Sequence, residues 1–380
     1  MKNIGLHEPY FAGNEIKYLK NCIKENWVST SGKYLKLFEK KVKAITKAKF
    51  AIPVLNGTIG LHMSMILSGV KKNDEVIVPT ITFIATVNAI KYVGANPIFM
   101  DIDQYLNIDE DKTIEFILNN TKYRRGKTIN NKTGKTIRAL VVVHTFGNAA
   151  KMEKLYNLCK KKNIKLIEDA AESLGTKYTS GKFKKKHTGT IGDFGVFSFN
   201  GNKIITSGNG GVIVTNNKKY YLKANYLITQ AKDNGVNFIH NEVGFNYKLS
   251  NVCAALGLAQ LENLKYFIKK KKTIRNYYIK KTKNMRELEI MSNPKYSINN
   301  NWLNLIKIKS SKNINLIIKK LSFKKIQLRP VWYPNHLQKP FKENYSYKIK
   351  NAQKIIKNLI CLPSSVNLKK SQIDKIIKNI

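Results

Sequence analysis

Lys203 lies between two clusters of small and polar residues, in the segment FSFNGNKIITSGNGG at 197–211. Ser198 and Gly201 precede it, and a turn rich in glycine (207–211) follows it. A lysine amine that is removed from water becomes nucleophilic and forms Schiff bases with carbonyl compounds. A single lysine in so lysine-rich a chain is far more often a surface residue, so only this neighbourhood makes Lys203 a candidate nucleophile.

Acidic residues close the apolar run IKLIEDA at 164–170, where Glu168 and Asp169 are followed by Ala170, Ala171 and Glu172. A carboxylate at the end of a buried strand is costly unless it faces a cation or a protonated ring nitrogen. The two alanines leave room beside it for a flat group. A helix N-cap explains the same residues equally well, and the local sequence leaves both interpretations open.

The tripeptide Asn56-Gly57-Thr58 follows the strand-like run AIPVL and precedes a helical stretch. Glycine lets the backbone approach a ligand, and a helix N-terminus offers unpaired N–H groups to an anion. An ordinary polar helix cap is the more common explanation of such a tripeptide.

Short apolar runs alternate with helix-length segments beyond residue 50, which is typical of α/β architecture. We expect a helix over 82–93 and a loop or hairpin over 121–136. In open α/β sheets ligands bind at the carboxyl ends of the strands, where all three candidate segments fall. The predicted strands are 51–55, 75–79, 97–102, 138–144, 164–170, 193–199 and 210–215.

A long helical segment runs from about residue 250 to 281, and strand-like runs follow at 301–309 and 328–333. We therefore expect a large domain with an N-terminal arm over residues 1–250, and a long connecting helix with a smaller α+β domain over 251–380. No internal repeat of 20–50 residues is visible.

The chain of 380 residues carries a formal net charge of +44, which invites a nucleic-acid-binding interpretation. Only six of its 68 basic residues are arginines, whereas specific readers of bases and phosphates favour arginine. The lysines are spread over the whole chain rather than gathered on one motif. A polyanion- or nucleic-acid-binding protein remains the alternative of a different class, and salt-sensitive retention on heparin tests it.

Four widely spaced cysteines form no CxxC pair, and 43% of the residues are hydrophobic. We expect reduced thiols and no metal site. No run approaches the roughly 18 apolar residues of a membrane span, and the N-terminal residues lack the apolar core of a secretory signal. The prediction is a cytoplasmic protein without a membrane segment.

Taken together and in this order, the candidate segments resemble the DegT/StrS-type sugar aminotransferases, a branch of the fold-type I enzymes that use pyridoxal 5'-phosphate (PLP). The likeness covers essentially the whole chain. The segments that carry it are HEPYFAGNE (7–15), WVSTSGKYLKLFE (27–39), NGT (56–58), DEVIVPTITFIATVNAI (74–90), EDAAESLG (168–175), GDFGVFSFNGNKIITSGNGG (192–211), EVGFNYKLSNVCAALGLAQLE (242–262), LRPVWYPNHLQKPF (328–341) and LPSS (362–365).

The resemblance implies an α/β fold-type I architecture, with a mostly parallel central sheet flanked by helices and a smaller α+β C-terminal domain. It implies that Lys203 binds PLP as a Schiff base and later moves the proton, and that Asp169 faces the pyridine nitrogen. A carboxylate there keeps that nitrogen protonated, as an electron sink requires. Glu172 matches the position that contacts the ring hydroxyl, and Phe83 the aromatic that stacks on the ring.

The same resemblance implies a phosphate site made by Gly57, Thr58 and the hydroxyl of Ser198. Asn246, in GFNYKLSN, matches a residue that reaches the phosphate from the neighbouring subunit. The expected working unit is therefore a homodimer with shared active sites.

The implied reaction moves an amino group from L-glutamate to C4 of a nucleotide-linked 4-keto-6-deoxy sugar. The motifs look most like the legionaminic-acid-pathway type, whose substrate is a nucleotide-linked 2-acetamido-2,6-dideoxy-4-hexulose. Perosamine and viosamine synthases, which act on GDP-, UDP- or dTDP-linked 4-keto-6-deoxyhexoses, are the alternative. The candidate substrate contacts are Trp27, Ser29, Arg329 and His336.

Overall fold

The computed structural model describes residues 3–309 and 313–380. Its largest element is a ten-stranded sheet whose main path runs β1-β10-β9-β7-β6-β2-β3-β15, with the hairpin β4–β5 attached to β6. The strands are β1 (Phe50–Val54), β2 (Glu75–Pro79), β3 (Asn96–Met100), β4 (Thr121–Arg124), β5 (Lys127–Asn130), β6 (Thr136–Val143), β7 (Lys165–Asp169), β9 (Phe194–Ser198), β10 (Gly211–Thr215) and β15 (Ser346–Tyr347).

The centre of this sheet is parallel and its edges are mixed. β9, β7, β6, β2, β3 and β15 pair in parallel, whereas β1 and β10 pair antiparallel, as do β4, β5 and β6. Val143 of β6 lies opposite Asp169 of β7, which in turn lies opposite Val196 of β9. The carboxyl ends of these three strands therefore meet at one edge, and the predicted α/β class is confirmed.

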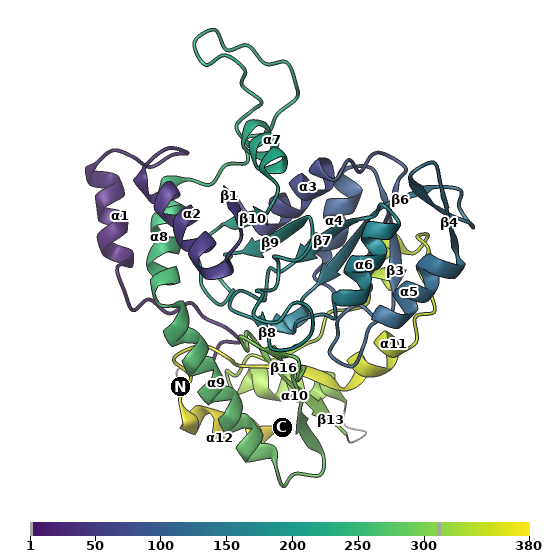
Figure 1. Cartoon of the computed structure of the whole chain (residues 1–380). Helices are drawn as coiled ribbons and strands as arrows, with labels where there is room; N and C mark the ends of the chain where they lie inside the picture. Colours follow the sequence, from purple (N-terminus) through teal and green to yellow (C-terminus); the bar gives the residue numbers. More distant parts are fainter. Residues whose placement is uncertain (1–2, 310–312) are drawn as a thin grey trace.

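Helices cover both faces of the sheet, as Figure 1 shows. Along β2, Val76 and Val78 belong to one buried cluster and Ile77 to another, because successive side chains in a strand point to opposite faces. The helices that flank the sheet are α2 (Lys33–Thr46), α3 (Gly57–Leu67), α4 (Ile84–Tyr92), α5 (Glu110–Asn119), α6 (Glu153–Lys161) and α7 (Lys218–Ile228). α8 (Asn251–Glu262) packs on α2, and α1 (Glu15–Lys24) packs on α8.

The C-terminal part builds a second, four-stranded sheet in the order β11-β13-β16-β14. Ile4, near the N-terminus, bridges to Ile326 in this part, and β15 of the C-terminal part pairs with β3 of the large sheet. The chain therefore passes between the two sheets more than once. The division at residue 250 stays a prediction. The remaining elements are β8 (Lys177–Tyr178), α9 (Leu264–Thr282), β11 (Leu288–Ile290), β12 (Ser297–Ile298), β13 (Asn304–Ile308), α10 (Ile314–Phe323), β14 (Arg329–Pro330), α11 (Asn351–Ile355), β16 (Leu359–Leu362) and α12 (Lys370–Asn379).

Two expected elements differ from the structure. The single long helix expected from residue 250 is broken at Asn263, whose side chain donates to the Ala259 carbonyl over 3.3 Å and so competes with the helical ladder. The strand expected at 328–333 is reduced to Arg329–Pro330, because Pro330 and Pro334 lack the N–H that a ladder needs.

No helix within the described residues is long and apolar enough to cross a membrane.

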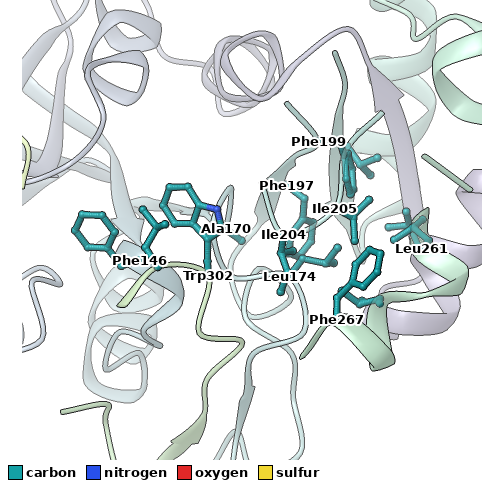
Figure 2. Close-up of a cluster of buried hydrophobic side chains, with 14 of the residues drawn as sticks. Phe146, Ala170, Leu174, Phe197, Phe199, Ile204, Ile205, Leu261, Phe267 and Trp302 are labelled. Atoms are coloured by element: carbon teal, nitrogen blue, oxygen red, sulfur yellow. The ribbon is translucent and has the colours of Figure 1, made fainter. Parts of the chain in front are cut away.

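The largest buried cluster contains the residues on both sides of Lys203 (Figure 2). Phe197, Phe199, Ile204 and Ile205 all belong to it. The segment that carries Lys203 is thus held by buried apolar side chains before and after the lysine.

Candidate active site

The carboxyl ends of the central strands open into a cavity of about 450 Å³. It collects residues from all three candidate segments at the strand ends, together with Arg329 from much later in the chain. The predicted site residues that line it are Gly57, Thr58, Phe83, Asp169, Glu172, Ser198, Lys203 and Arg329.

One end of the cavity is the N-terminus of α3. Asn56 caps this helix by accepting the Ile59 N–H at 2.9 Å, and the N–H groups of the first turn have no partner within a helix. A Cβ on Gly57 would lie 3.0 Å from the Cβ of Ser198, so glycine allows the serine hydroxyl to lie beside this turn. A helix N-terminus with an adjacent hydroxyl is a suitable binding site for a phosphate group.

Asp169 projects into the cavity from the end of β7 with an exposed fraction of 5%. Its Oδ2 accepts the hydroxyl of Thr86 at 2.7 Å, and its Oδ1 accepts the N–H of Ala171 at 3.1 Å. No lysine, arginine or histidine of the described residues forms an ion pair with it. A buried carboxylate without a cation of its own suits a ligand that brings one.

Lys203 lies across the cavity floor, with its Nζ 3.3 Å from Oε1 of Glu172. The Phe146 N–H donates to the other oxygen, Oε2, at 2.7 Å. Burial raises the pKa of Glu172 to about 7, with the charge of Lys203 opposing the shift. The Glu172 side chain therefore changes charge near neutral pH, next to the candidate nucleophile.

This arrangement fits PLP. The helix N-terminus and Ser198 match an anionic phosphate, Asp169 a protonated ring nitrogen, and Lys203 an aldehyde. Glu172 also lines the cavity, and its contact with the ring hydroxyl stays a prediction. Phe83, at the N-terminus of α4, is 54% exposed and lines the cavity beside Trp332, with 6.3 Å between their ring centroids.

Four predicted residues lie outside the cavity of the single chain. Asn246 is exposed at the base of the loop that projects beyond α7 (Figure 1), where it pairs with Thr229. Trp27 and Ser29 are exposed between α1 and α2. His336 is half-buried behind the site, with its Nδ1 2.6 Å from the Thr80 hydroxyl. The functional roles of all these residues stay predictions.

The structure adds residues that sequence reasoning did not select. Thr86 bonds Asp169, while Trp302 and Trp332 line the cavity wall on either side of Phe146. Thr86 and Trp332 lie inside segments already singled out for the resemblance. Phe146 and Trp302 carry no local signal, because their place depends on how distant segments pack.

Comparison with known proteins agrees with this geometry. The model of the DegT/DnrJ/EryC1/StrS aminotransferase family matches residues 9–380. A GDP-perosamine synthase of Escherichia coli O157:H7 is 36% identical over 380 residues, covering 100% of this chain and 98% of that protein. A UDP-4-amino-4,6-dideoxy-N-acetyl-beta-L-altrosamine transaminase of Campylobacter jejuni is 34% identical over 269 residues, covering 70% of this chain and 66% of that protein.

Among solved structures, the aminotransferase TlmJ from Streptoalloteichus hindustanus superposes with a TM-score of 0.88 at 23% identity, covering 100% of this chain and 98% of that one. This similarity shows that the two chains share a fold. The match to the family model and the similarity to the perosamine synthase along the whole chain together establish the family of this protein. The chain belongs to the DegT/DnrJ/EryC1/StrS aminotransferase family and is a PLP-dependent aminotransferase.

Proposed function

We propose that the enzyme transfers the amino group of L-glutamate to C4 of a nucleotide-linked 4-keto-6-deoxyhexose. The observation that carries this proposal is the meeting of Lys203, Glu172 and Asp169 in the cavity that also contains the α3 N-terminus. When bound, PLP supplies the electron sink for the reaction.

The residues of the chain supply the rest. The first turn of α3 and Ser198 bind the phosphate group, and Asp169 stabilises a positive ring nitrogen. Lys203 Nζ accepts a proton from the carbon of the amino donor and returns it at a neighbouring carbon. Glu172 takes up or releases a proton near pH 7 and so adjusts the charge beside Nζ.

The C2 substituent of the sugar separates two candidate substrates. The legionaminic-type motifs and the Campylobacter jejuni transaminase favour a UDP-linked 2-acetamido sugar. The GDP-perosamine synthase, which matches the whole chain, favours a GDP-linked 4-keto-6-deoxyhexose. Arg329 at the cavity wall carries a planar guanidinium suited to carboxylate or phosphate oxygens, so either substrate offers it a partner.

Absorption spectroscopy of the purified enzyme tests both halves of the reaction. We expect a visible band from the lysine-bound cofactor that L-glutamate bleaches and D-glutamate does not. The GDP- and UDP-linked 4-keto sugars are then added separately, and the true acceptor restores the band. Absence of the band after incubation with PLP contradicts the assignment of Lys203, and restoration by neither sugar contradicts the proposed acceptor class.

A further inference from the structure

Trp302 contacts the candidate nucleophile in two ways. The Nζ of Lys203 lies over the indole ring, 4.4 Å from its centroid. The indole Nε1–H donates to the carbonyl of Asn202, the residue before the lysine, at 2.7 Å. One side chain therefore contacts the charged end of Lys203 and also holds the turn from which it extends.

Trp302 is in turn packed against Phe146. Their rings stack with centroids 6.0 Å apart and planes 17° apart, and Figure 2 shows the two side chains at one end of the buried cluster. Trp332 stacks on Phe146 with 4.6 Å between centroids and 13° between planes. Phe146 has a φ of 54°, a left-handed conformation that is unfavourable for a bulky residue. In this conformation the backbone N–H of Phe146 donates to Oε2 of Glu172.

The backbone of Trp302 is fixed from behind by Lys271. This lysine is fully buried, and its Nζ donates to the carbonyls of Trp302 at 2.8 Å and Ser364 at 2.6 Å. No carboxylate of the described residues forms an ion pair with it. Burial lowers the pKa of Lys271 well below its usual value. A buried amine that bonds only backbone carbonyls in this way ties two loops together, and one of them carries Trp302.

We propose that Trp302 is a positioning residue that stabilises the protonated amine of Lys203 during the half of the reaction in which this lysine carries the proton. The inference rests on the proposed role of Lys203. When the C–H bond of the amino donor breaks, its electron pair stays on the carbon framework and Nζ receives the proton. The negative face of the indole then lies against the positive charge that develops, and both side chains are largely shielded from solvent, with Trp302 3% and the Lys203 side chain 12% exposed.

The charge state of Lys203 can be measured without turnover. Wild-type apoenzyme is treated with acetic anhydride across a pH series, and acetylation of the Lys203 peptide is quantified by mass spectrometry. Only the neutral amine reacts, so loss of a contact that favours the ammonium moves the midpoint of labelling to lower pH. For Trp302→Leu we expect a shift of about one pH unit, and for Trp302→Phe a smaller shift in the same direction.

Trp332→Leu is the matched control. It removes the indole on the other side of Phe146 but no contact to Lys203, so the labelling midpoint of Lys203 stays at its wild-type value. If the labelling midpoint of Lys203 shifted as far in this variant as in Trp302→Leu, the shift would come from loosened packing around the cavity rather than from the indole of Trp302. That outcome would overturn the proposal.

Fluorinated tryptophan keeps the test decisive if Trp302→Leu does not fold. Fluorine weakens the negative ring face with little change in shape, and in the Trp332→Leu background only Trp302 and the exposed Trp27 are labelled. We expect the midpoint to fall stepwise as fluorines are added. An unchanged midpoint in folded protein overturns the role of Trp302. Since no substrate is present, this outcome is independent of whether the sugar acceptor has been chosen correctly.

Discussion

At the scale of single residues, the site holds one carboxylate, Asp169, that forms no ion pair within the described residues, beside the pair of Lys203 and Glu172. Asp169 is buried with a hydroxyl and an N–H as partners, and Glu172 shares its carboxylate between a backbone N–H and Lys203. A ligand with a protonated ring nitrogen would give Asp169 a cation, and one with an aldehyde would suit the amine of Lys203 in the proposed role. PLP brings both.

Replacing Asp169 by asparagine tests the first of these requirements. The amide keeps the size of the side chain and can still accept the Thr86 hydroxyl, but it carries no negative charge for the ring nitrogen. We expect the turnover number to fall by a factor of about 100 or more while PLP still binds. Steady-state kinetics measures the turnover number, and the far-ultraviolet circular dichroism spectrum is the folding control. If the variant turned over as fast as wild type, the ring nitrogen would have a partner other than Asp169.

Glu172 makes the stability of the apoenzyme depend on pH. Its pKa is raised from 4.5 to about 7, so the folded chain binds a proton that the unfolded chain has already lost between these values. The free energy of unfolding therefore decreases as pH rises from about 4.5 to about 7, by roughly 3 kcal/mol from this group. Glu172→Gln removes this contribution.

Urea unfolding of wild-type and Glu172→Gln apoprotein at several pH values measures this pH-dependent part of the free energy of unfolding. The stability difference between Glu172→Gln and wild type is expected to grow in favour of the variant as pH rises. Parallel stability curves for the two proteins would mean that Glu172 does not titrate in this range.

At the scale of elements, the strand end that presents Asp169 is held from behind by a buried pair. Glu168 accepts the His144 Nε2–H at 2.9 Å, together with the N–H groups of Gly189, Ile191 and Gly192 at 2.6–2.8 Å. His144 Nδ1 accepts the Ala150 N–H at 3.1 Å, which leaves Nε2 as the nitrogen that donates to Glu168. Adjacent residues of β7 thus point to opposite sides, one to the cavity and one to the scaffold.

Glu168→Ala removes the acceptor of four donors, three of them buried. We expect the free energy of unfolding to fall by about 3 to 5 kcal/mol, because several buried donors lose their acceptor at once. Glu25→Ala is the control, since Glu25 pairs with Lys33 on the exposed surface and its loss changes stability by less than about 1 kcal/mol. Equal effects in urea unfolding would show that the buried network contributes no more than a surface pair.

At the scale of the whole molecule, the single chain presents features that a second copy would explain. The loop beyond α7 projects from the body (Figure 1), and Val236, Phe238 and Val243 on it are 86%, 68% and 86% exposed. Exposed apolar side chains gathered on one projection indicate a contact surface. Asn246 lies at its base, in keeping with the proposed reach toward the cavity of a partner.

Mixing two inactive variants tests the shared site. Lys203→Ala and Asn246→Ala are each expected to lose most activity as homodimers. In a mixed dimer one site carries both defects and the other carries neither. Random exchange of subunits gives mixed dimers in half of the population, so activity recovers to about a quarter of wild type. The control is a mixture of Lys203→Ala with Lys203→Met, which contains no intact site. No recovery after confirmed exchange would place Asn246 in the site of its own chain.

The sequence by itself determined the alternation of strands and helices and the chemistry at the strand ends. Its local patterns are strong because buried strands must be apolar and helix starts need caps. Lys203, Asp169 and Gly57 each stand in such a pattern. The order of these segments along the chain carried the resemblance, and the family comparison confirmed it.

The tertiary structure decided the features that depend on contacts between distant segments. Trp302 lies 99 positions beyond Lys203, and Phe146 bonds Glu172 only because a left-handed turn aims its N–H there. Packing of this kind has no period in the sequence, because each contact is set by the close fit of surfaces that meet only when the chain has folded.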